Sequence, residues 1–273
     1  MGLLVPFRAV PYHNVTGTGP RMGPSSQTMT IKQGDAFHPD AGSAHDLHTA
    51  RLIQESLRKH CITTRTAVTR SLRFIAGADA AYSDDTAYAA AVVMSFPGGQ
   101  FVEAACSVRP AEFPYVPGLL SFREGPPVID AVRTLSRKPD LLVVNGHGYA
   151  HPRRAGLACH LGVVLDIPVV GVARNLLAGT SALPGPGRGA CEPVLDEDEV
   201  IGMAVRTRTG VKPVYVSAGH KVDLTQAVEI VMKTVTTHRF PEPLHLADLI
   251  SRACRRSDES RAPGTAFHLV NKA

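Results

Sequence analysis

The stretch Leu141-Leu142-Val143-Val144-Asn145-Gly146 is a compact apolar run that stops at a polar residue and a glycine. Residues 157–165 then place apolar side chains at helical spacing, and residues 168–172 form a second short apolar run. Two buried runs joined by a helix are typical of a βαβ unit, in which the two strands are parallel. We therefore expect parallel strands at 141–144 and 168–172.

Three apolar runs upstream of this unit are separated by short turns. The runs cover residues 74–81, 88–95 and 101–108, with turns at Asp84-Asp85 and Pro97-Gly98-Gly99. Neighbouring strands with short links predict an antiparallel meander. Together with the βαβ unit, the meander predicts an α/β fold with one mixed central sheet flanked by helices.

The remaining segments supply helices, later strands and two polar ends. A helix is expected from the capping-box sequence at 43–46, and another whose N-terminus contains Pro126-Pro127. Downstream we expect a surface loop at 180–193, strands at 200–205 and 213–217, and a helix at 224–232. The predicted organisation is a basic, disordered arm (1–42), one domain (43–250) and a charged tail (251–273).

Composition limits the class of protein. With 44% apolar residues in a chain of 273, a substantial core can form, which excludes a disordered or collagen-like protein. A formal net charge of +5 favours anionic partners. The five cysteines form no CxxC pair, so we expect a reducing, cytoplasmic location. The longest apolar run, 87–94, is too short for a membrane helix, and we assign no targeting signal.

Three polar residues at the ends of apolar runs are candidates for chemistry. Asp79 lies near the end of the first strand and Asn145 directly follows the strand at 141–144, where ligands gather in open sheets with parallel strands. Glu124 precedes the expected helix at Pro126, where a carboxylate also complements the helix dipole. Hard oxygen ligands of this kind suit Mg²⁺, and the expected substrate is a phosphodiester.

Other motifs have ordinary structural explanations. His147 and His151 are four residues apart, but Pro152 and two glycines disrupt the helix that a zinc-binding histidine pair requires. Tyr115-Val116-Pro117-Gly118 is, in isolation, a type II turn with a half-exposed ring. Neither a GxxxxGK phosphate loop nor a GxSxG motif occurs, so nucleotide triphosphate chemistry and serine hydrolysis have no support.

Taken in order and spacing, these segments resemble the endonuclease V family, nucleases that recognise deaminated bases, chiefly hypoxanthine. The resemblance spans about residues 45 to 235. It is carried by Ile75–Tyr82, Tyr115–Glu124, Asn145–Leu157 and Pro168–Arg174, with a weaker match at Val216–His220.

The resemblance implies a ribonuclease H-like fold and Mg²⁺-dependent hydrolysis, with Mn²⁺ as a substitute. The expected cut is at the second phosphodiester 3′ of the deaminated base, in DNA more than in RNA, as in DNA repair. Asp79 and Glu124 match the family's metal-binding carboxylates. His220 and His151 match histidines that orient the attacking water and support the metal or the phosphate.

The resemblance also implies a set of substrate contacts. Tyr115, before the turn at Gly118, matches a wedge that fills the gap left by the extruded base. The main-chain amides of Gly146, His147 and Gly148 match the pocket that reads that base. Arg174 matches a cation that contacts a phosphate, whereas Arg123, Arg153 and Arg154 either hold phosphates or are plain surface charges. A monomer without membrane contact is expected.

Two positions depart from the family pattern. Asn145 stands where the family has a metal-binding aspartate, which removes a full charge from the site. Arg174 stands where the family has lysine. Asn145 has three explanations: a natural variant with weakened activity, an introduced substitution that traps a bound state, or a protein that binds deaminated nucleic acid without cutting it. Deamidation at Asn145-Gly146 would restore the aspartate.

Overall fold

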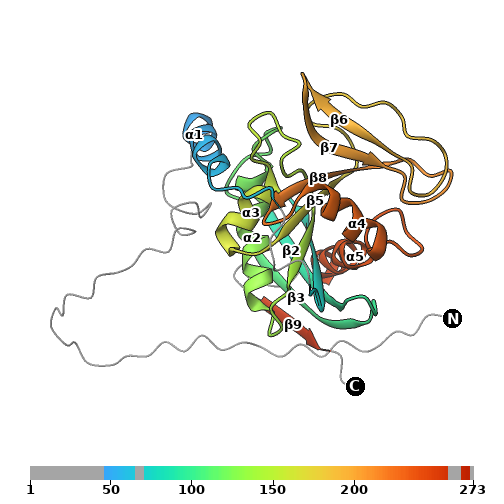
Figure 1. The fold of residues 1–273 in the computed structure, drawn as a ribbon. Coiled ribbons are helices and arrows are strands. Elements are labelled where there is room, and N and C mark those ends of the chain that lie inside the picture. Colours follow the sequence, from blue (N-terminus) through green and yellow to red (C-terminus); the bar gives the residue numbers. More distant parts are fainter. Residues whose placement is uncertain (1–45, 65–70, 258–265, 271–273) are drawn as a thin grey trace, which may run out of the picture.

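The computed structural model describes residues 46–64 and 71–257, together with the backbone of one strand at 266–270. Its centre is a nine-stranded sheet in the order β6-β7-β8-β5-β4-β1-β2-β3-β9 (Figure 1). The strands are β1 (Phe74–Ser83), β2 (Thr86–Ser95), β3 (Phe101–Pro110), β4 (Leu141–Asn145), β5 (Val169–Ala173), β6 (Cys191–Asp196), β7 (Glu199–Val205), β8 (Val214–His220) and β9 (Ala266–Val270).

The strand directions confirm the expected mixed sheet. β1, β2 and β3 are antiparallel neighbours, so the meander is confirmed. β4 pairs in parallel with both β1 and β5, which confirms the βαβ unit. β8 is antiparallel to β5, and β7 is antiparallel to β8.

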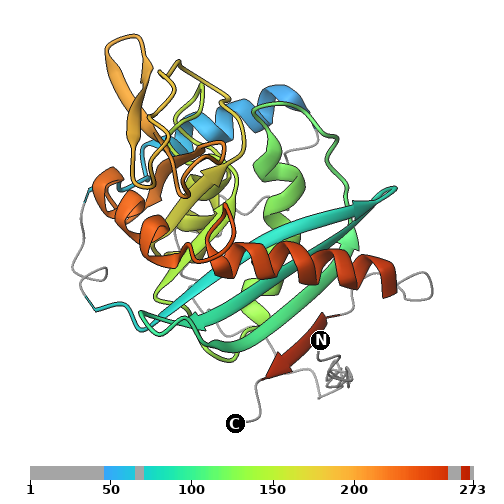
Figure 2. The same ribbon diagram turned by 90° about the vertical axis from the view of Figure 1, so that its right-hand side faces the viewer.

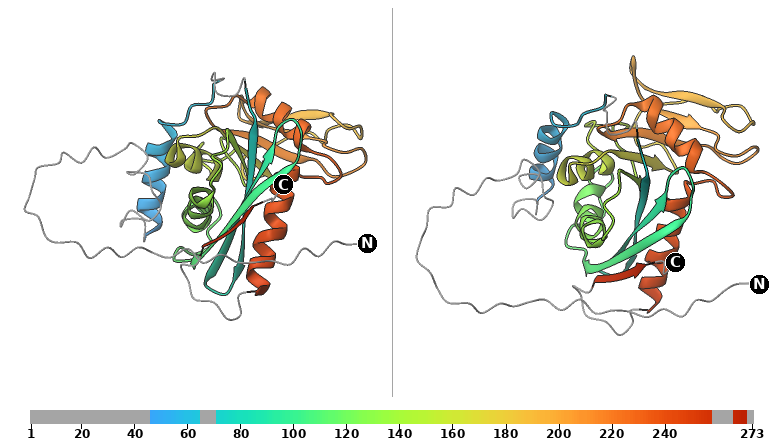
Figure 3. Two further views of the ribbon diagram at one scale, coloured as in Figure 1. Left: turned by 90° about the horizontal axis from the view of Figure 1, so that it is seen from below. Right: turned by 60° about the horizontal axis from the view of Figure 1, so that its bottom comes forward.

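Helices cover both faces of the sheet (Figure 3). They are α1 (Leu47–Arg58), α2 (Leu120–Thr134), α3 (Leu157–Leu165), α4 (Leu224–Thr234) and α5 (Glu242–Ser257). One core layer lies between the sheet and α2 and α3, and a second lies between the sheet and α4 and α5. Within the described residues, no helix combines the length and the apolar character needed to cross a bilayer.

The start of α2 differs from the prediction. Pro126 and Pro127 lie inside the helix, which begins at Leu120, so Glu124 is a helical residue and does not precede the helix. Two prolines remove two intrahelical hydrogen bonds. Burial of Phe122, Val128 and Ile129 against the core compensates for that loss, because tertiary packing supplies most of a helix's stability in proteins.

Other boundaries also differ. The predicted loop at 180–193 runs into β6, which the sequence analysis missed and which pairs with β7 as a hairpin. The expected boundary at residue 250 falls inside α5, which continues to Ser257. The first helix is confirmed with Asp46 as its N-cap, whereas residues 43–45 and the arm at 1–42 lie outside the described residues.

Gly77 allows α5 to lie directly on β1. α5 crosses the face of the meander (Figure 2), and a Cβ atom at Gly77 would lie 2.2 Å from the backbone carbon of Pro243 and 2.3 Å from the nitrogen of Leu244. No side chain fits there unless the helix moves. Every second residue of a strand points to the same face of the sheet. Asp79, two residues after Gly77, therefore faces the α5 side as well.

We expect Gly77→Ala to destabilise the protein by about 3 kcal/mol or more, because backbone cannot move aside as a flexible side chain can. In a chain of this size, that corresponds to a melting temperature lower by roughly 6 to 12 °C in thermal unfolding. Gly187→Ala is the control, since a Cβ there has no neighbour within 4 Å. Equal melting temperatures for the two variants would show that α5 does not press on β1.

Candidate active site

Asp79 and Asn145 meet where the parallel pairing of β1 with β4 ends. The register pairs Ala78 of β1 with Val144 of β4, so Asp79 and Asn145 come next on the two strands. The Nδ2 group of Asn145 lies 3.2 and 3.3 Å from the two carboxylate oxygens of Asp79, to which it donates. Asp79 is only 6% exposed and also accepts a 2.9 Å hydrogen bond from the Ala80 amide.

Glu124 reaches the same site from α2. Burial raises the pKa of Glu124 to about 8, and the nearby Asp79 carboxylate adds to the rise, whereas Arg123 lowers it. Burial likewise raises the pKa of Asp79 to about 7, opposed by its hydrogen bonds from Ala80 and Asn145. Two carboxyl groups held together out of water therefore disfavour ionisation, which is the electrostatic situation that a bound cation relieves.

Asp248 is a further acid near Asp79 that the sequence analysis missed. Its charge contributes to the raised pKa of Asp79, and its carboxylate lies 2.7 Å from Arg252 one turn along α5. The signal in the sequence is the amphipathic pattern of residues 242–257, in which Asp248 follows the buried Leu244 and Ala247. No helix was predicted there, so Asp248 was not placed beside the sheet.

The prediction that His220 joins these carboxylates is wrong. β8 runs antiparallel to β5, so His220 pairs with Val169 at the start of β5, whereas Asn145 pairs with Val172 near its end. His220 therefore lies at the opposite end of the sheet. Its Nδ1 accepts a 3.2 Å hydrogen bond from the Ile62 amide, and burial lowers its pKa to about 4.

His151 is a buried part of the scaffold. Its Nδ1 accepts a 3.1 Å hydrogen bond from the Arg153 amide, so Nε2 carries the proton and donates to the Gly118 carbonyl at 2.9 Å. The same carbonyl accepts hydrogen bonds from Gln54 and from the Arg153 guanidinium. Burial lowers the pKa of His151 to about 4, consistent with a neutral ring. His151 thus anchors the turn at Gly118, which has a φ of 81°.

The loop after β4 offers fewer backbone N–H groups to a ligand than expected. The amide of Gly146 donates to the carbonyls of Val144 and Val172, and the amide of Gly148 donates to Ser217 Oγ at 2.8 Å. These two amides, which were expected to read a base, therefore already donate within the fold. His147 Nε2 lies 2.9 Å from the Asn175 carbonyl.

Several predicted cationic contacts divide into two groups. Arg174, directly after β5, favours the ionised form of Asp79, and its guanidinium lies 5.2 Å from the centre of the Phe240 ring. Arg123 lies 4.5 Å from the centre of the Tyr82 ring. Arg154 forms ion pairs of 2.8 Å with both Asp196 and Glu199 of the β6–β7 hairpin. Arg174 and Arg123 thus belong to the site, while Arg154 holds the hairpin to the loop after β4.

The donor set matches a divalent cation with few protein ligands. Asp79 and Glu124 supply carboxylate oxygens, and the Asn145 amide presents its oxygen after a half-turn about its terminal bond. Between residues 46 and 64 and between 71 and 257, no three His, Cys, Asp or Glu side chains lie close enough together to hold a metal ion. The candidate set of Asp79, Glu124 and Asn145 contains two charged ligands and one neutral ligand.

Without divalent ions, we expect the free energy of unfolding to fall by on the order of 1 kcal/mol between pH 6.5 and 8. Asp79 and Glu124 have pKa values raised to about 7 and about 8, so the folded protein retains protons that the unfolded chain has lost. That stabilisation disappears as the pH rises through these values. Below pH 6.5 the lowered pKa values of His151 and His220 act in the opposite direction.

Chemical denaturation at several pH values measures this dependence, and Asp79→Asn is expected to flatten it. A profile in Asp79→Asn as steep as that of the wild type would assign the dependence to other groups.

A meander followed by parallel strands, with a buried acid on β1 beside the end of β4, is typical of ribonuclease H-like nucleases. A family model for endonuclease V matches residues 55–249. Endonuclease V of Roseiflexus castenholzii is 49% identical over 206 residues, which is 76% of this chain and 92% of that protein. The chain belongs to the endonuclease V family, and it is a nuclease.

Solved structures of the same family superpose on this fold. Endonuclease V from Streptomyces avermitilis has a TM-score of 0.76 at 39% identity, covering 81% of this chain and 97% of that one. Endonuclease V of Ciona intestinalis, in complex with a 24mer DNA containing an inosine followed by a ribo-adenosine, has a TM-score of 0.68 at 28% identity. That comparison covers 78% of this chain and 98% of the Ciona chain.

Proposed function

We propose that this protein is a Mg²⁺-dependent endonuclease that hydrolyses a phosphodiester 3′ of a deaminated base, chiefly hypoxanthine, in nucleic acid. The observation that carries the proposal is the meeting of the Asp79, Glu124 and Asn145 side chains where the parallel pairing of β1 with β4 ends. Structures of the family include a complex with inosine-containing DNA, which favours DNA as the substrate.

Asp79, Glu124 and the oxygen of Asn145 would hold the cation, with Mn²⁺ as a substitute. Bound Mg²⁺ supplies polarisation of the scissile phosphate, a more acidic water and charge stabilisation for the leaving 3′-oxygen. Burial of Asp79 excludes bulk water from the carboxylate pair and strengthens its attraction for a cation. Arg174 is placed to bind a phosphate next to these carboxylates.

Tyr115 is the proposed wedge for the gap left by an extruded base. Its side chain is 69% exposed, which is unusual for a tyrosine and leaves the ring available to stack. The three hydrogen bonds that converge on the Gly118 carbonyl hold the end of its turn. A rigidly held loop lets an exposed ring enter the stack with little additional loss of conformational entropy.

The second candidate function is binding of deaminated nucleic acid without hydrolysis. The observation that favours it is Asn145, whose amide nitrogen donates to both oxygens of Asp79 where the family has an aspartate. An amide lacks the full negative charge that draws a divalent ion into the site. Both functions use the same fold and the same substrate class, so only turnover separates them.

The deciding experiment incubates the wild-type protein with Mg²⁺ and a strand containing one inosine, beside an identical strand without it. The proposal expects a single cut near the inosine, dependent on Mg²⁺ and absent from the control strand. Inosine-dependent binding without any cut would instead support the binding function. Equal affinity for both strands, with no cleavage, would overturn both.

We further propose that the protein acts in DNA repair as a monomer in the cytoplasm. The five cysteines are free thiols, as expected for a reducing compartment. Sedimentation at micromolar concentration tests the monomer.

A further inference from the structure

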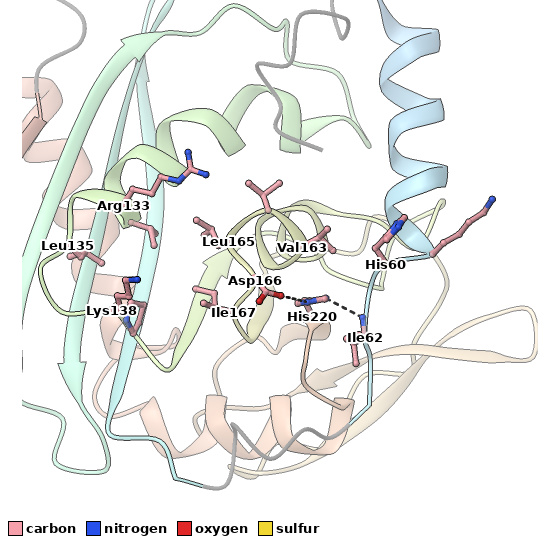
Figure 4. A pocket seen from close by; sticks show the side chains of 14 residues that line it. His60, Ile62, Arg133, Leu135, Lys138, Val163, Leu165, Asp166, Ile167 and His220 are labelled. Atoms are coloured by element: carbon pink, nitrogen blue, oxygen red, sulfur yellow. Dashed lines mark hydrogen bonds and ion pairs between the residues drawn. The ribbon is translucent and has the colours of Figure 1, made fainter. Parts of the chain in front are cut away.

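A second concave site lies at the end of the sheet opposite the carboxylates. It is a cavity of about 1020 Å³ between the C-terminal ends of α1, α2 and α3, and His220 lines it (Figure 4). Nothing in the proposed reaction uses this cavity. We refer to it as the basic pocket because of the side chains described next.

Cationic side chains line the basic pocket from two sides. Arg133 and Lys138 lie on one side and Lys59 on the other, next to His60, as Figure 4 shows for Arg133, Lys138 and His60. Asp166 is the acid in the lining, and its carboxylate forms a 2.7 Å ion pair with Lys221. The lining therefore carries net positive charge, which attracts an anion.

Aliphatic side chains form the wall between these cations. Val163, Leu165 and Ile167 come from the end of α3 and the turn into β5, and Ile62, which is 42% exposed, lies opposite. Among the residues that the structure describes, neither Phe nor Tyr lines the pocket. An apolar wall between separated cations fits a ligand that combines flat apolar groups with several distributed negative charges.

We propose that the basic pocket binds a single-stranded flank of the nucleic acid, independently of its sequence, while the substrate occupies the carboxylate site. Cations on two sides of a cavity match successive phosphates of a strand better than one phosphate group. A duplex would leave the apolar wall unused, whereas a single strand exposes its base faces. This inference rests on the proposed function, because it assumes a nucleic-acid substrate.

The distance between the two sites sets the length of strand required. β5 has five residues and separates the two ends of the sheet, which at about 3.3 Å per residue is roughly 15 Å. At about 3.4 Å per phosphate, the helical spacing of a stacked strand, roughly five nucleotides span this distance. A shorter strand that is bound at the carboxylates does not reach the basic pocket.

The test compares the wild type with the double variant Lys59→Glu, Lys138→Glu, which reverses one exposed charge on each side of the pocket. Lys233→Glu, Arg256→Glu is the control, with the same charge change at exposed positions that do not line the pocket. Fluorescence anisotropy with chelator present measures affinity for inosine-free single strands, one shorter than the span and one several times longer. Thermal unfolding checks that both variants fold.

The wild type and the control are expected to bind the long strand roughly tenfold more tightly than the short one. The pocket variant should lose that difference. The slope of its log affinity against log salt concentration should also be smaller in magnitude than the wild-type slope by about 1.4, the value for two phosphate contacts on a single strand. A length effect that persists in the pocket variant, or an equal loss in the control, would overturn the proposal. Complete competition by a free mononucleotide at micromolar concentration would also overturn it.

Cleavage of a short inosine strand separates this inference from the proposed function. The pocket variant should cut that strand at the wild-type rate, because the strand does not reach the pocket. If no variant cuts it, the proposed function fails, while the binding measurements still decide the role of the pocket.

Discussion

Asp79→Asn is expected to lower the rate of Mg²⁺-dependent cleavage by on the order of a thousandfold. Asp79 is the most buried of the proposed metal ligands, and its carboxylate is shared between Asn145 and the Ala80 amide. An asparagine at this position keeps the shape and the hydrogen bond from Asn145 to an oxygen. It removes one of only two negative charges that the proposed site presents to a cation.

The same variant should be more stable than the wild type in metal-free buffer at pH 8. Burial and the nearby Asp248 disfavour the charge that it removes, and that charge in turn raises the pKa of Glu124. Added Mg²⁺ should stabilise the wild type and leave Asp79→Asn nearly unchanged, since only ligands of the native state stabilise it. Thermal unfolding with and without Mg²⁺ measures this difference.

Asp130→Asn is the matched control, because Asp130 pairs with Arg109 on the surface of α2. It should change neither cleavage nor the response to Mg²⁺. Cleavage by Asp79→Asn within tenfold of the wild-type rate would show that the carboxylate pair is not the metal site.

Asn145→Asp is expected to lower the Mg²⁺ concentration that gives half-maximal cleavage by roughly tenfold to a hundredfold. A third carboxylate at the ends of β1 and β4 adds an attraction for a divalent cation that amounts to a few kcal/mol in a partly buried site. The hydrogen bonds from Nδ2 to Asp79 are replaced by repulsion between two carboxylates. The variant should therefore melt at a lower temperature than the wild type without metal and regain stability when Mg²⁺ is added.

Gln100→Glu controls for the change from amide to acid at an exposed turn, and it should behave as the wild type does. Cleavage by the aspartate variant alone would support the binding function for the wild type. Equal Mg²⁺ requirements for Asn145→Asp and the wild type would show that the amide oxygen serves as well as a carboxylate. Intact mass must show that Asn145 has not deamidated in the wild-type sample.

Local patterns account for the parts of the fold that were predicted. The runs that became β1 to β5 and the helix α3 are continuous in sequence, so their period and turn residues are visible without knowledge of their neighbours. α2 was misplaced because two prolines signal a helix start locally, whereas packing of the buried Phe122 extends the helix before them. β6 was missed because Gly and Pro dominate the residues that lead into it.

The chain alone determined β4 and its parallel partner β5, because two apolar runs joined by a helix form a βαβ unit whose strands share one direction. The pairing of β1 with β4, which brings Asp79 to Asn145, depends on tertiary contacts. The tertiary structure decided where His220 and Asp248 lie. The direction of β8 and the passage of α5 over Gly77 depend on contacts between residues far apart in sequence, and local periodicity carries no record of such contacts. His220 was thereby placed in the basic pocket and Asp248 beside the carboxylates.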